Sequence, residues 1–82
     1  MGIGQFLTNA EKIETLNTIK SVLSVEIYSM CVKLGIEPDD FDYSSYSATN
    51  APASQLTQFN LLEFHCQKLI AVIEKLESLE NV

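Results

Sequence analysis

Apolar side chains recur at alternating intervals of three and four residues in two long segments of the chain, which is the spacing of one helix face. In the first segment Lys20 fills one position of this series, and the apolar members are Ile13, Leu16, Leu23, Ile27, Met30 and Leu34. Thr8 followed three residues later by Glu11 is a capping-box pattern, and Gly35 is a typical helix stop. We therefore predict a helix over residues 9–34.

The second segment carries a more regular series, whose members are Phe59, Leu62, Cys66, Leu69, Ile73 and Leu76. Ser54 follows Pro52 and is a candidate N-cap, and neither glycine nor proline interrupts the residues after it. We predict a second helix over residues 54–80 and a loop over residues 36–53. The fold expected for residues 1–82 is a single all-α domain, a helical hairpin of two long helices. The loop is long enough to run back along a helix, so a parallel crossover is the alternative to the antiparallel hairpin.

Both segments also carry apolar side chains away from the main stripe, when placed at about 100° per residue. A lone pair of helices covers one side of each helix, so these side chains would contact water. Burying one Leu, Ile or Val is worth roughly 1.5–3 kcal/mol, whereas a chain of this size seldom gains more than about 3–5 kcal/mol from a single core. We therefore predict that two hairpins associate into a four-helix bundle, as a homodimer or alternatively a tetramer. The predicted oligomer interface consists of Val25, Tyr28, Val32, Leu61, Val72 and Leu79.

The predicted loop is long for a connection between bundle helices, which indicates either a function or disorder. Pro38 and the acids after it suit one helical turn, and three aromatic side chains could fold over the open end of the bundle as a lid. A partly ordered loop that only caps the core is the simpler interpretation. The alternative is a partner-binding surface, in which tyrosines supply contact area and acids complement a basic partner. The candidate partner-binding residues are Asp39, Asp40, Phe41, Asp42, Tyr43 and Tyr46 in the loop, with Glu74 and Glu77 near the end of the second helix.

The charge balance narrows the range of partners. Eleven acids face five lysines, giving a net charge of −6, and the chain has no arginine. Phosphate backbones and anionic membranes would repel such a chain, so we expect neither direct nucleic-acid binding nor membrane binding. No apolar run approaches the roughly 20 residues of a membrane-spanning helix.

The two cysteines are too few for a disulfide framework, and both lie on or beside apolar faces. We expect reduced, buried thiols and a cytoplasmic location. His65 and Cys66 are adjacent on the predicted helix and point about 100° apart, which suits neither a shared metal nor a catalytic pair. His65 is instead expected at the edge of the seam beside Leu61 and Leu69. We expect no metal, no cofactor and no enzymatic activity.

The function that these features favour is a small, non-enzymatic, homo-oligomeric protein-interaction module, such as an adaptor, scaffold or regulatory subunit. Two alternatives stay open. One is an acidic inhibitor whose carboxylates stand in for phosphates on a basic, nucleic-acid-binding partner. The other is a helical bundle that holds an apolar ligand in a cavity lined by Met30, Phe59 and Cys66.

Overall fold

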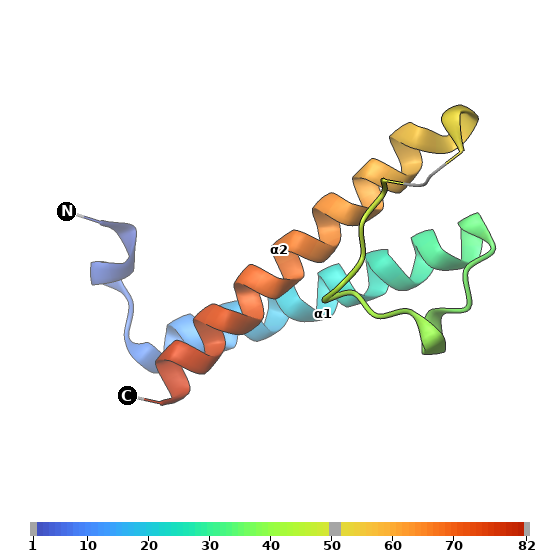
Figure 1. Cartoon of the computed structure of the whole chain (residues 1–82). Helices are drawn as coiled ribbons and strands as arrows, with labels where there is room; N and C mark the ends of the chain where they lie inside the picture. Colours follow the sequence, from blue (N-terminus) through green and yellow to red (C-terminus); the bar gives the residue numbers. More distant parts are fainter. Residues whose placement is uncertain (1, 50–51, 82) are drawn as a thin grey trace.

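The structure is a computed structural model that describes residues 2–49 and 52–81. Two long helices, α1 (Asn9–Leu34) and α2 (Leu56–Glu80), run antiparallel as a hairpin (Figure 1). Short 3₁₀ turns accompany the helices: η1 (Ile3–Phe6) precedes α1, η2 (Pro38–Asp40) follows it, and η3 (Ala53–Gln55) leads directly into α2. The described residues contain no strand. The prediction of an all-α helical hairpin is confirmed, while its association into a four-helix bundle stays a prediction.

The ends of α1 are set by local hydrogen bonds. The Glu11 N–H donates to Thr8 Oγ1 at 3.1 Å, and the Thr8 N–H donates to Glu11 Oε1 at 2.9 Å. At the other end Gly35 adopts φ 77°, a left-handed conformation that glycine reaches without strain, and the Ile36 N–H donates to the Cys31 carbonyl at 2.8 Å. Helix α1 has the predicted bounds. The capping box and the glycine stop act through hydrogen bonds that reach only a few residues, so the local sequence determines both ends.

The start of α2 differs from the prediction. Ser54 is not an N-cap, since it lies inside η3, where the Gln55 N–H donates to the Pro52 carbonyl at 2.9 Å. Helix α2 begins at Leu56, and its N-cap, Gln55, makes no side-chain capping bond. Residues 50 and 51 of the predicted loop lie outside the described residues.

The hydrophobic core lies between the two helices and consists of Leu23, Ile27, Cys31, Leu62, Cys66 and Leu69. Leu62, Cys31 and Cys66 are almost completely enclosed. Both cysteines are free thiols. Burial raises the pKa of both thiols, that of Cys66 to about 11, because the thiolate would lose its hydration. The prediction of buried, unpaired cysteines is confirmed.

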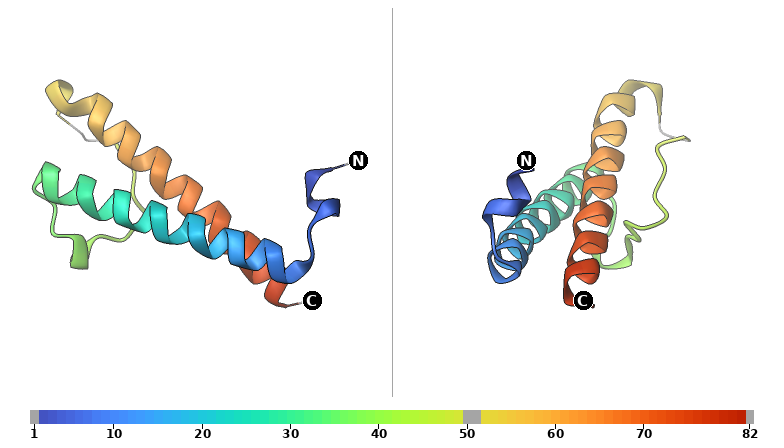
Figure 2. Two further views of the ribbon diagram at one scale, coloured as in Figure 1. Left: turned by 180° about the vertical axis from the view of Figure 1, so that it is seen from behind. Right: turned by 90° about the vertical axis from the view of Figure 1, so that its left-hand side faces the viewer.

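The hairpin is open at one end. The helices lie close together near the two ends of the chain and diverge toward the connector, as two viewing directions agree (Figures 1 and 2). The molecule measures 44 × 27 × 18 Å, and its radius of gyration of 15.0 Å exceeds the roughly 12 Å typical of a compact domain of this length. The chain therefore forms one layer of helices with a partial cover from the connector.

No helix within residues 2–49 and 52–81 combines the length and the apolarity needed to cross a bilayer.

Candidate functional site

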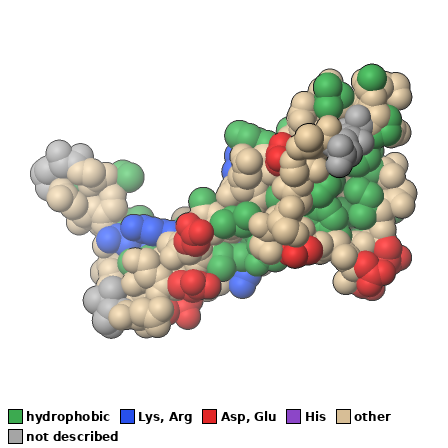
Figure 3. All heavy atoms as spheres, viewed as in Figure 1, with side chains coloured by type: hydrophobic (Ala, Val, Ile, Leu, Met, Phe, Trp, Pro, Cys, Tyr) green, Lys and Arg blue, Asp and Glu red, His purple; other side chains and the backbone are tan. Residues whose placement is uncertain are grey.

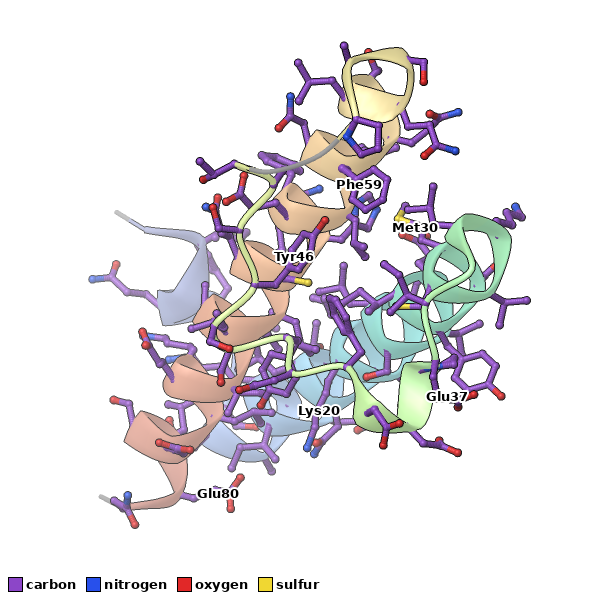
Figure 4. All side chains as sticks on the ribbon, turned by 45° about the vertical axis from the view of Figure 1, so that its right-hand side comes forward. Lys20, Met30, Glu37, Tyr46, Phe59 and Glu80 are labelled. Carbon is purple, nitrogen blue, oxygen red and sulfur yellow. The ribbon has the colours of Figure 1, made fainter. Side chains whose placement is uncertain are left out.

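Residues 41–49, named the strap, turn back across one side of the hairpin before the chain reaches α2 (Figure 1). Phe41, Tyr43 and Tyr46 are partly buried against the core, and Ala48 is buried. The Phe41 and Tyr46 rings are 5.0 Å apart between centroids. Aromatic packing of the loop on the core is thus present as predicted. The strap covers one side of the hairpin, however, and leaves its open end free, where Phe59 and Met30 lie on opposite helices (Figure 4).

The hydrogen bonds of the strap are local. The Asp42 carboxylate accepts bonds from the Ser44 N–H at 3.0 Å, the Ser44 hydroxyl at 2.6 Å and the Ser45 hydroxyl at 2.9 Å. These donors lower the pKa of Asp42 because they stabilise its charged form. Among the described residues, no backbone–backbone hydrogen bond joins residues 42–49 to either helix. Side-chain packing alone therefore holds the strap on the core.

Tyr46 points toward the core from the strap (Figure 4). Its hydroxyl is buried and has no hydrogen-bond partner among the described residues. Burial raises the pKa of Tyr46, and the neighbouring Cys66, Glu63 and Cys31 add to the shift. An unsatisfied buried hydroxyl costs about 1–3 kcal/mol. Tyr46 therefore packs against the core at the expense of its hydroxyl group, and is a poor candidate for direct contact with a partner.

A hollow of ≈ 190 Å³ lies between α1, η2 and the start of the strap. Three aromatic side chains line it: Tyr28 from α1, and Phe41 and Tyr43 from the connector. Its remaining lining is mostly apolar and consists of Ser24, Ile27, Cys31, Pro38 and Leu69. The structure thus brings Tyr28, predicted for the oligomer interface, beside two candidate partner-binding residues. This arrangement was not predictable from the sequence, because it depends on where the connector returns across α1.

Acidic side chains surround this part of the connector (Figure 3). Asp39, Asp40 and Asp42 are all exposed. Glu37 Oε1 accepts the Asp39 N–H at 3.2 Å, so Glu37 and Asp42 each stabilise a turn. In the described part of the chain, the Asp39 and Asp40 carboxylates accept no hydrogen bond and form no ion pair. They remain available to a cation from outside.

Glu74 and Glu77, the second predicted partner surface, are exposed near the C-terminal end of α2. Glu80 marks that end in Figure 4, far from Glu37 beside η2. The two acidic surfaces proposed from sequence are thus separate.

The predicted oligomer interface does not form one continuous face. Val25 and Val32 lie on the side of α1 that faces away from α2 and are 68% and 57% exposed. With Val22, which is 53% exposed, they form what we name the outer stripe of α1, within an arc of about 80° at 100° per residue.

The three predicted interface residues on α2 have different surroundings. Leu61 is 48% exposed and borders the open end of the hairpin. Val72 is partly buried against the core of its own chain. Leu79 is partly buried and lines a hollow of ≈ 250 Å³ with Leu7 and Leu16. Only Leu61 offers a large exposed surface comparable to that of the outer stripe.

His65 connects the two helices, a contact that the sequence did not predict. Its Nε2 lies 2.7 Å from Glu26 Oε2 on α1, and its Nδ1 lies 2.9 Å from the Leu61 carbonyl. A carbonyl and a carboxylate oxygen both accept hydrogen bonds, so a ring N–H of His65 can donate to either one. The described residues contain no group of three or more His, Cys, Asp or Glu side chains arranged for a metal ion.

The hollow at the open end, ≈ 310 Å³, is not the predicted apolar cavity. Its lining is Met30, Lys33, Leu34, Gln55, Gln58 and Leu61. Met30 is present, but Phe59 and Cys66 are not, and three of the lining residues are polar or charged. This composition does not add support to an apolar ligand.

Comparison of the chain with protein-family models, curated proteins and solved structures finds no match in any of the three.

Proposed function

We propose that the chain is a small, non-enzymatic, homo-oligomeric protein-interaction module that pairs with a second copy through the outer stripe of α1. The observation that supports this most directly is the amount of exposed surface. The chain exposes 5818 Å², whereas a folded monomer of 9.1 kDa typically exposes about 4,900 Å². The excess of about 900 Å² resembles the roughly 800 Å² that each partner buries in a standard interface.

Much of this exposed surface is apolar. Large apolar side chains that are 40% or more exposed are Ile3, Phe6, Leu7, Ile19, Val22, Val25, Tyr28, Val32, Leu56, Leu61 and Phe64. Single exposed apolar residues are ordinary, but a contiguous row along one helix is typical of a contact surface. The outer stripe is a short row of this kind, in which Val22 and Val25 are neighbours and Ser29 separates them from Val32.

The outer stripe lies on the side of α1 opposite α2, where the described residues of the chain leave it exposed. Stable domains generally bury their apolar faces between at least two layers. A second hairpin placed on the outer stripe would set the two α1 helices against each other, cover both stripes and give a four-helix arrangement with twofold symmetry. In such a dimer each copy covers the same stripe on the other.

The mass in solution tests this proposal. At about 100 micromolar, light scattering should give twice the 9.1 kDa of one chain. Replacing both Val25 and Val32 by glutamate should leave the circular-dichroism helix signal unchanged, because both positions are exposed, but should reduce the mass to that of a monomer.

A matched control places the same two charges elsewhere. Asn60→Glu with Gln67→Glu changes exposed polar positions of α2 and should leave the mass doubled. A wild-type chain that is monomeric at this concentration overturns the proposal. A dimer that survives the two glutamates on α1 overturns the assignment to the outer stripe.

A further inference from the structure

We propose that the hollow between Tyr28, Phe41 and Tyr43, named the aromatic hollow, binds a lysine or arginine side chain from a basic segment of a partner protein. This inference rests on the interaction-module part of the proposed function and does not depend on self-association.

The shape of the aromatic hollow suits a long cationic side chain. Three rings from two separate segments line a single space of ≈ 190 Å³. The faces of such rings attract ammonium and guanidinium groups. The floor, which includes Ile27 and Leu69, is apolar and suits the methylene stem that precedes the charge of lysine or arginine.

The charge of the surroundings selects a cation over an apolar anchor. Four acids stand between residues 37 and 42, and the sequence has no lysine or arginine between Lys33 and Lys68. The Asp39 and Asp40 carboxylates are exposed and, in the described part of the chain, free of hydrogen bonds and ion pairs. A partner that places one basic side chain in the hollow can bring further basic residues to these carboxylates.

The chain shows the same chemistry within itself. Lys68 Nζ lies 4.4 Å from the centroid of the Phe64 ring on α2. That contact is made on an exposed helix surface by one ring. The aromatic hollow offers three rings and a neighbouring source of negative charge. A cation in the hollow is therefore expected to bind more strongly than one over the single Phe64 ring.

The test is a titration, followed by NMR amide shifts, with a synthetic peptide that alternates arginine with leucine. A second peptide carries citrulline in place of arginine, which keeps the shape and removes the charge. We expect shifts centred on Tyr28, Phe41 and Tyr43, binding that weakens as salt is added, and at least about tenfold weaker binding of the citrulline peptide. Equal binding of the two peptides, absence of binding at millimolar peptide, or shifts centred on the outer stripe overturns the inference.

Variants distinguish binding in the aromatic hollow from unspecific attraction of the peptide to an acidic chain. Tyr43→Ala should weaken the arginine peptide by about 2–30-fold, the range expected for a cation–ring contact. The double variant Asp39→Asn with Asp40→Asn should weaken binding of the arginine peptide. The double variant Glu74→Gln with Glu77→Gln removes the same charge at the far end of α2 and should leave this binding unchanged. Equal losses in the two double variants indicate unspecific attraction and overturn the inference.

Light scattering of the Tyr43→Ala chain distinguishes the two proposals. An unchanged mass with weakened peptide binding supports the aromatic hollow as a separate site. A drop to monomer shows that the hollow belongs to the contact between copies, and the inference is then wrong even though self-association holds.

Discussion

Leu61 and Leu62 are neighbours on α2 with the same side chain, yet Leu61 is 48% exposed and Leu62 is completely buried. Cys31 and Val32 on α1 form a similar pair, at 0% and 57%. In each pair one residue belongs to the seam between the helices and the other to the outside of the hairpin. The seam holds one chain together, while the outside is left uncovered by the described residues of the chain. Apolar character alone therefore does not separate a residue that folds this protein from one that offers a contact.

The largest expected effect comes from truncating the two leucines in turn. Leu62→Ala should lower the free energy of unfolding by about 2–5 kcal/mol, because it leaves a cavity in the core. In a chain that gains about 3–5 kcal/mol from its core, this loss removes a large part or all of the stability. Leu61→Ala should cost less than about 1 kcal/mol in dilute protein, since its side chain is half exposed. Urea unfolding followed by circular dichroism measures both, and similar losses would contradict the distinction between seam and outside.

The next effect concerns pH and the buried thiol of Cys66. Its pKa is about 11 in the folded chain, against an ordinary value of 9.0, so on raising the pH the unfolded chain loses this proton first. The stability contribution is fully present below pH 9 and should decline between pH 9 and 11, by up to about 2–3 kcal/mol. Urea midpoints at pH 8 and pH 10.5 test this prediction. Cys66→Ala, which has no proton to lose, should show a smaller decline, and an equally steep one would refute the attribution to Cys66.

The smallest effect concerns the strap, which is buried on one side and exposed on the other. Tyr46→Phe removes a hydroxyl that has no partner in the described structure, and should raise the free energy of unfolding by about 1 kcal/mol. Tyr28→Phe is the matched control, because Tyr28 is 57% exposed and its hydroxyl can bond to water. The control should change stability by less than about 0.5 kcal/mol. A loss of stability in Tyr46→Phe would mean that its hydroxyl has a partner after all.

Local signals in the sequence were sufficient for much of the fold. The bounds of α1 follow from Thr8, Glu11 and Gly35, whose hydrogen bonds reach only a few residues along the chain. The seam residues of α2 follow from their period, and Leu62, Cys66, Leu69 and Leu76 are indeed its buried residues. Ser54 gave a wrong start for α2, because the 3₁₀ turn that contains it competes with a capping role.

The surface arrangement was less accessible from sequence, since it depends on how separate segments meet. The contact between Glu26 and His65 requires the register of α1 against α2, which neither residue's neighbours indicate. Tyr28 joins Phe41 and Tyr43 only because the connector returns across α1. The six residues proposed as one interface lie off the main stripes, three on α1 and three on α2. Helix periodicity does not say whether the residues on α1 and those on α2 face the same side of the hairpin, and in the structure they face different sides.

The start of α1 and the end of α2 lie where the helices come together, while the aromatic hollow lies toward the diverging end (Figures 1 and 2). A tag, dye or surface linker attached at either terminus is therefore held away from η2 and the strap. Protein immobilised in this way would present its acidic, tyrosine-bearing tip outward to the solution. The geometry thus favours biosensor formats that anchor the chain by its ends.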